Sequence, residues 1–321
     1  MSHEVTLIPG SGAGPALAEV AREVLAHAGV PITWDVQPCA DLDVTGAVAS
    51  VKRTGIALKG ALSAPVRVGK LPPSLQLRKE LGVHTIVRHV KHVPGLPARA
   101  PETDIVIIRE ASEDIYSGFE HQSTAGVFES VKVTTRAACE RITNFAFAYA
   151  KANGRGRVTT VHKANIMKKA DGLFLSVGRE VAAKHPELRH DDVIVDALCM
   201  KLVRRPRDFD VLVCGNLFGD IVSDCAAGMA GGPTVAVGTS LGPNVTLFET
   251  PHGCGTDAQG AANPYPFVLL AGQLAAHLGH ADAAARIRKA VETCLTGGLH
   301  TVDMGGTASV ASVREALLKA L

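Results

Sequence analysis

The chain has 321 residues, of which 46% are hydrophobic and 20% charged, so its composition is that of a globular protein with about two domains. Its 33 Lys and Arg residues nearly balance its 31 Asp and Glu residues, and aromatic residues make up only 4%. These values exclude a nucleic-acid-coating protein, which needs a strongly basic surface or aromatic stacking platforms. The longest apolar run, residues 267–276, is too short to cross a membrane.

The cysteines indicate a reducing environment. There are seven of them, widely spaced and without a Cys-x-x-Cys pair. An odd number at such spacing is typical of buried, reduced thiols and not of a disulfide framework or a zinc site. We therefore expect a cytoplasmic protein.

Short β-branched runs alternate with longer helical patterns along the whole chain. In chain order we expect a strand and Gly-rich turn at 5–10, a helix at 15–27, strands at 32–36 and 56–62, a helix at 74–81, a strand at 104–109, a β-rich stretch at 116–134, helices at 136–153, 170–184, 218–228, 264–277, 281–293 and 310–320, and strands at 158–161, 193–195 and 211–213. This alternation predicts an α/β protein with a mostly parallel sheet. The proline-rich loop 93–103 is the expected crossing between domains.

Two acidic residues, Asp220 and Asp224, lie four positions apart and therefore on one face of the predicted helix 218–228. Like charges at this spacing repel each other unless a cation holds them, and hard oxygen ligands suit Mg²⁺ or Mn²⁺. The flanking residues are small and apolar, which is unusual for a solvated face. A metal site and an exposed acidic face both remain open on this pattern alone.

Three arginines lie near the ends of predicted elements: Arg78, Arg88 and Arg109. Guanidinium groups bind carboxylates through two parallel hydrogen bonds, and α/β proteins bind ligands at strand ends. A single arginine is most often a surface residue. Three of them beside a candidate metal site favour a small polyanionic substrate.

Several long motifs occur in the order found in one enzyme family. They are 108–121 (IREASEDIYSGFEH), 161–168 (VHKANIMK), 194–198 (IVDAL), 216–224 (NLFGDIVSD), 248–253 (FETPHG) and 262–264 (ANP). Together they span nearly the whole chain, and they resemble the isocitrate/isopropylmalate dehydrogenases, nearest to the NAD-dependent isocitrate branch.

The resemblance implies a two-domain α/β fold that is not a Rossmann fold, with a mixed sheet flanked by helices. It implies a large cofactor-binding domain formed by 1–94 and 235–321, and a small domain at 95–234 that carries the metal site. A β clasp at about 116–134 would lie at the interface of a homodimer.

The resemblance also implies a role for each matching site residue. The residues are Ser74, Arg78, Arg88, Arg109 and Asn165 for the substrate; Tyr116 and Lys163 for proton transfer; Asp196, Asp220 and Asp224 for Mg²⁺ or Mn²⁺; and His252, Gly253, Asp257 and Asn263 for NAD. Lys163 and Asp196 are expected to complete the active site of the partner subunit. A carboxylate at Asp257 would repel a ribose 2′-phosphate by about 1–4 kcal/mol, which favours NAD over NADP.

The chemistry expected of these residues is oxidative decarboxylation of a 3-substituted malate, most simply isocitrate to 2-oxoglutarate. The family pattern is altered at Ala111, where an Asn is usual, and in the helix around Ser74, where Pro72 occupies the usual Ser position. These changes lie where the variable substrate group is expected. Homoisocitrate or a phosphonate such as phosphonomethylmalate is therefore an alternative substrate, and a non-catalytic regulatory subunit is an alternative of another class. The basic segment 67–92 argues against isopropylmalate, whose apolar group needs an apolar pocket.

Overall fold

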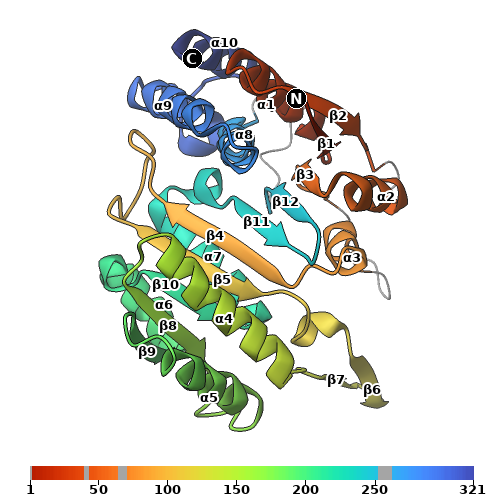
Figure 1. The fold of residues 1–321 in the computed structure, drawn as a ribbon, viewed down its shortest axis with the longest axis vertical. Helices are drawn as coiled ribbons and strands as arrows, with labels where there is room; N and C mark the ends of the chain where they lie inside the picture. Colours follow the sequence, from red (N-terminus) through yellow and green to blue (C-terminus); the bar gives the residue numbers. More distant parts are fainter. Residues whose placement is uncertain (1, 40–42, 64–70, 252–261) are drawn as a thin grey trace. The chain divides into compact units, whose positions relative to one another are not determined.

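The computed structural model describes residues 2–39, 43–63, 71–251 and 262–321. The chain forms two compact units, one of residues 1–82, 92–101 and 231–321, and the other of residues 83–91 and 102–230. Figure 1 follows both units in sequence colours. No helix in the described ranges is long and apolar enough to span a bilayer.

In its described residues, the first unit has five strands in the order β2-β1-β3-β12-β11, which are all parallel except β11. These strands are β1 (His3–Ile8), β2 (Ile32–Val36), β3 (Ile56–Lys59), β11 (Gly238–Leu241) and β12 (Thr246–Glu249). Its helices are α1 (Gly14–His27), α2 (Thr45–Thr54), α3 (Pro73–Glu80), α8 (Tyr265–His277), α9 (Ala281–Thr296) and α10 (Val310–Ala320). Helix α8 is apolar on nearly every side and is accordingly buried, packed by α1 and α9.

The second unit has five strands in the order β4-β5-β10-β8-β9, of which only β4 is antiparallel to its neighbour. They are β4 (Thr85–Lys91), β5 (Asp104–Glu110), β8 (Arg157–His162), β9 (Arg189–Ile194) and β10 (Val211–Cys214). The helices are α4 (Arg136–Ala152), α5 (Ala170–Ala182), α6 (Val195–Arg204) and α7 (Asn216–Ala230). A separate hairpin joins β6 (Glu120–Thr124) to β7 (Val127–Ser130).

Side chains on β5 alternate between the two faces of this sheet. Val106 and Ile108 pack with Ile142 and Phe147 of α4 in the core of the unit, and α4 lies in front of the sheet in Figure 1. Ile107 and Arg109 therefore project from the opposite face, against which α7 packs. The fold thus places α7, with its two aspartates, over a buried arginine.

The α/β class with a mixed sheet is confirmed. The expected domain boundary placed 83–91 in the first domain, whereas the compact units group this segment with the second. The reason is strand pairing: β4 pairs with β5 along its whole length, from Thr85 opposite Glu110 to Lys91 opposite Asp104.

Candidate active site

Arg109 lies near the end of β5 and forms the base of the site in the second unit. It is only 1% exposed; its Nε donates to Asn216 Oδ1 at 2.9 Å and its Nη1 pairs with Asp220. Helix α7 approaches this closely because residue 219 is glycine: a Cβ there would lie 2.7 Å from Arg109 Cγ. Asn216, which the motifs do not single out as a site residue, is buried at the first position of α7 and orients the guanidinium.

Tyr116 meets the same carboxylate from a short 3₁₀ turn, Ile115–Ser117. Its hydroxyl donates to Asp220 Oδ2 at 2.6 Å, and the guanidinium carbon of Arg109 lies 5.1 Å from its ring centroid. Burial and the hydrogen bond to Asp220 raise the pKa of Tyr116 to about 12. The phenol is therefore protonated at neutral pH and can act as a proton donor.

Arg88 joins this cluster through the register of β4 and β5. Arg88 lies opposite Ile107 and Ile86 lies opposite Arg109, so the two arginines are diagonal neighbours on one face of the sheet. Arg88 is also 1% exposed. Asp220 and Asp224 lie on one face of α7, and the side chain of Asp220 is 39% exposed. The structure thus brings together two buried cations, a neutral phenol and accessible carboxylates.

Lys163 and Asp196 form a second pair in this unit. Lys163 lies in the turn after β8, and its Nζ is 2.8 Å from Asp196 Oδ1 in the first turn of α6. Asn165 is exposed in the same turn. Among the described residues, no three His, Cys, Asp or Glu side chains lie close enough to hold a metal ion. Asp196 is therefore not gathered with the two aspartates of α7 within one chain.

Arg78 and Ser74 lie on α3 in the first unit, where Arg78 is already engaged. Its Nε donates to Glu249 Oε1 at 2.9 Å, and Lys59 Nζ lies 3.0 Å from Glu249 Oε2. Glu249 and Lys59 are both buried, and the hydroxyl of Ser240 also donates to Glu249. The motifs do not single out Lys59 or Glu249 as site residues; the available signal is a charged residue closing each of two short apolar strands.

The buried Glu249 carboxylate predicts a pH-dependent contribution to stability. Burial opposes ionisation, but Arg78 and Lys59 outweigh it and hold the pKa of Glu249 well below its usual range. E249Q leaves two cations without their partner, so we expect its free energy of unfolding at pH 7 to fall by about 3–5 kcal/mol. The pKa of Glu249 is lower in the folded state than in the unfolded state. Its contribution to stability is therefore present above about pH 4.3, the pKa of an unfolded Glu, and is lost as the pH falls below that value.

Chemical denaturation of wild type and E249Q from pH 7 to pH 3 checks this expectation, and the gap between them should narrow below about pH 4. The matched control is E23Q, which breaks the exposed pair between Glu23 and Arg314. That pair is exposed to solvent, which screens the attraction, so E23Q should change the free energy of unfolding only slightly. Equal losses of unfolding free energy in E249Q and E23Q at pH 7 would contradict the stabilising role given to the buried Glu249 carboxylate.

Of the expected NAD-binding residues, His252, Gly253 and Asp257 lie outside the described residues. Asn263 is described and is 1% exposed. Its Nδ2 donates to Thr234 Oγ1 and to Asp303 Oδ2, both at 2.9 Å, and its Oδ1 accepts the Tyr265 N–H at the start of α8. The position of Asn263 is thus fixed by internal hydrogen bonds, and its contact with NAD stays a prediction.

Comparison with known proteins identifies the family to which the chain belongs. The family model for isocitrate/isopropylmalate dehydrogenase matches residues 4–317. The chain belongs to this family. Its members are β-decarboxylating dehydrogenases, so the chain is assigned to the oxidoreductases.

Individual relatives of the isocitrate/isopropylmalate dehydrogenase family support the assignment over nearly the full length. The chain is 41% identical to the NAD isocitrate dehydrogenase catalytic subunit 5 of Arabidopsis thaliana, over 97% of this chain and 87% of that one. It is 42% identical to the chloroplastic 3-isopropylmalate dehydrogenase of Solanum tuberosum, over 91% and 85%. The crystal structure of isocitrate dehydrogenase from Methylococcus capsulatus has a TM-score of 0.93, with 37% identity and 99% of each chain covered. The resemblance drawn from the motifs is confirmed.

Proposed function

We propose that the chain is a catalytic subunit that oxidises and decarboxylates a 3-substituted malate with NAD and a divalent metal ion, with isocitrate as substrate and 2-oxoglutarate as product. The observation that carries this proposal is the cluster of Arg88, Arg109, Tyr116 and Asp220. This cluster brings together two cations that can bind substrate carboxylates, a protonated phenol that can donate a proton, and a carboxylate of the kind that binds a divalent metal ion.

The donor set of α7 fits a hard divalent cation. Asp220 and Asp224 are one helical turn apart, and neither is buried. A divalent ion held there would acidify the substrate hydroxyl and polarise the ketone produced by oxidation. Arg88 and Arg109 supply the charge that binds and orients substrate carboxylates. Tyr116 donates the proton that replaces the lost carboxylate, and Lys163 accepts the proton of the hydroxyl.

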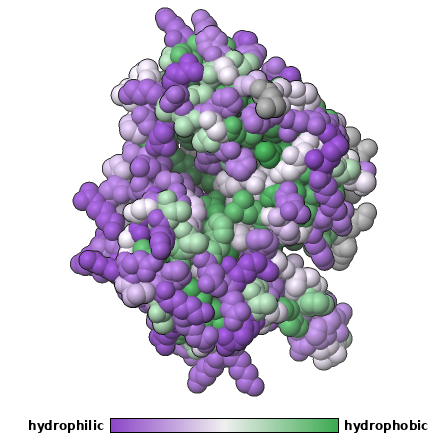
Figure 2. All heavy atoms as spheres, in the orientation of Figure 1, coloured by the Kyte–Doolittle hydropathy of each residue, from purple (hydrophilic) through white to green (hydrophobic). Residues whose placement is uncertain are grey.

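A homodimer with shared sites is part of the proposal. Large apolar side chains are exposed on the hairpin and on helices α6 and α7 of the second unit: Phe119 (62%), Phe128 (69%), Met200 (54%), Val203 (66%) and Ile221 (52%). Figure 2 shows apolar residues on the hairpin surface at the lower right. Exposed apolar surface of this kind is typical of subunit interfaces. If two copies of the chain paired through this surface, its exposed apolar side chains would be covered.

The basic segment 67–92 does not by itself decide which 3-substituted malate is the substrate. Residues 67–70 lie outside the described residues, and His89 and Lys91 both pair with Asp104, at 2.7 and 2.9 Å. Arg155 holds the same carboxylate at 2.7 Å. Within the second unit, Lys91 therefore forms an ion pair with Asp104, and His89 hydrogen-bonds to the same carboxylate while burial lowers its pKa. Homoisocitrate, phosphonomethylmalate and isopropylmalate accordingly belong in the substrate test.

A regulatory subunit is the second candidate, because relatives of this chain include both catalytic and regulatory subunits of NAD isocitrate dehydrogenases. The intact Tyr116–Asp220 and Lys163–Asp196 contacts favour catalysis. We also propose a reducing compartment such as the cytoplasm, supported by free thiols at all cysteines in the described ranges.

The deciding experiment is kcat/KM of the purified chain with Mn²⁺ and isocitrate, homoisocitrate, isopropylmalate, malate, tartrate or phosphonomethylmalate, using NAD or NADP. We expect preference for isocitrate, and for NAD over NADP by about 5- to 1000-fold. Comparable efficiency with NADP would refute the role given to Asp257, and a clear preference for isopropylmalate would refute the substrate. No turnover of any acid would favour the regulatory role.

A further inference from the structure

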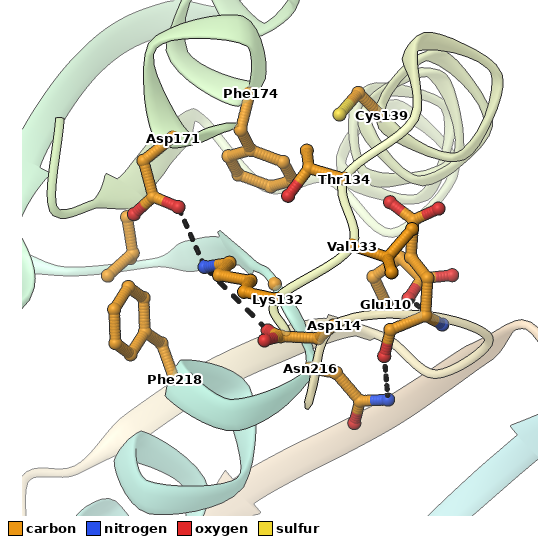
Figure 3. Close-up of a pocket in the computed structure, with 13 residues that line it drawn as sticks. Glu110, Asp114, Lys132, Val133, Thr134, Cys139, Asp171, Phe174, Asn216 and Phe218 are labelled. Atoms are coloured by element: carbon orange, nitrogen blue, oxygen red, sulfur yellow. Dashed lines mark hydrogen bonds and ion pairs between the residues drawn. The ribbon is translucent and has the colours of Figure 1, made fainter. Parts of the chain in front are cut away.

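Lys132 lies between two buried carboxylates of the second unit, as Figure 3 shows. Its Nζ is 2.7 Å from Asp171 Oδ1 and 3.8 Å from Asp114 Oδ2, and it lies 4.6 Å from the ring centroid of Phe218. The side chains of Asp114 and Asp171 are 3% and 4% exposed. The neighbouring cavity is only about 20 Å³, about the space of one water molecule. Electrostatic attraction is strong in such a poorly solvated place.

Asp171 holds the segment that carries Lys163. It is the second residue of α5, and its Oδ2 accepts the backbone N–H of Lys163 at 2.6 Å. The same carboxylate receives Lys132 on its other oxygen. The turn after β8, from which Lys163 reaches Asp196, is thus tied to Lys132 through one side chain.

Asp114 holds the segments that carry Tyr116 and Asp220. Its Oδ1 accepts the Ile115 N–H at 2.8 Å, and its Oδ2 accepts the Leu217 N–H at 3.1 Å, in the first turn of α7. Its φ of 79° and ψ of −155° lie in a region that residues other than glycine rarely adopt. A residue other than glycine keeps such a strained backbone conformation only when surrounding contacts hold it in place.

We propose that Lys132 is a positioning residue that couples the two proton-transfer groups of the chain through Asp171 and Asp114. The proposal rests on the proposed function, in which Tyr116 serves the chain's own site and Lys163 that of the partner. Lys132 then maintains the geometry of two active sites at once. Without its charge, the buried carboxylates lose a shared counterion and the hydrogen bonds that they accept are expected to loosen.

K132M tests the coupling, with K132R as the conservative rescue and K151M as the matched control at an exposed Lys–Glu pair. We expect K132M to lower kcat by about 10- to 100-fold, as loss of supporting contacts typically does, with substrate KM changed less than about threefold. K132R should recover most of kcat, and K151M should resemble wild type. A merely structural role would lower the melting temperature while leaving kcat of the folded protein intact.

Amide hydrogen exchange resolved to single residues gives a readout that needs no activity. In K132M, protection should fall at the amides of both Lys163 and Leu217; in D171N it should fall at Lys163 alone, and in D114N at Leu217 alone. Wild-type kcat together with unchanged exchange at both amides in folded K132M would overturn the proposal. If wild type turns over none of the acids, the proposed function fails, while exchange at the two amides still decides the coupling.

Discussion

The variants D220N and D224N are expected to lose about 1000-fold or more in kcat/KM. A divalent ion held by these carboxylates, as proposed, would acidify the hydroxyl and stabilise the enolate by several kcal/mol, and each 1.36 kcal/mol corresponds to a tenfold change in rate. Asn keeps the shape of the side chain but removes the charge that holds a hard cation. The measurement is the steady-state rate with Mn²⁺, together with Mn²⁺ affinity by titration calorimetry.

The two variants differ in what else they disturb. Asp220 also accepts hydrogen bonds from Tyr116 and Arg109, so D220N should lose more activity than D224N at saturating Mn²⁺. The control is D208N, in an exposed 3₁₀ turn of the same unit, which should leave both rate and affinity unchanged. An undiminished rate after chelation of divalent ions would show that the metal-dependent mechanism is wrong.

Long elements with a clear period were predictable from the sequence. The helix expected at 218–228 is α7 at Asn216–Ala230, and the strand expected at 32–36 is β2 with the same bounds. Helix α6 was not predicted, since its 10 residues follow β9 without a loop. Strands β11 (GTSL) and β12 (TLFE) were missed because each is short and carries polar residues, unlike the equally short strand β10 (VLVC), whose apolar run was predicted.

Some residues of the candidate site were predictable from the sequence and others were not. Tyr116 and Asp220 stand in long motifs, and the structure joins them by a hydrogen bond across 104 positions of sequence. Lys59 and Glu249 lie 190 positions apart, and their contact follows from the pairing of β3 with β12 and not from any local spacing. A single sequence does not encode such pairings as a pattern. The role of Asn263 at the start of α8 likewise depends on distant partners, Thr234 and Asp303.

Mixing two inactive variants is expected to restore activity if active sites are shared between subunits. In the proposed arrangement, K163A lacks the group that is supplied to the partner, and D220N lacks a metal ligand of its own site. In a heterodimer of the two, one site combines the intact Asp220 of one chain with the intact Lys163 of the other, while the second site carries both defects. Random pairing of equal amounts makes half of the dimers mixed, so about a quarter of wild-type activity should return.

The mixture must be unfolded or dissociated and reassembled together, and each variant treated alone is the control for recovery. A second control mixes D220N with D224N, whose defects lie in the same site, and no activity should return. The structure supports this design because Lys163 contacts Asp196 within its own chain, and no third acidic, His or Cys ligand joins Asp220 and Asp224 among the described residues. A fully active monomer in solution, or failure of K163A and D220N to complement after verified exchange of subunits, would show that each chain builds its site alone.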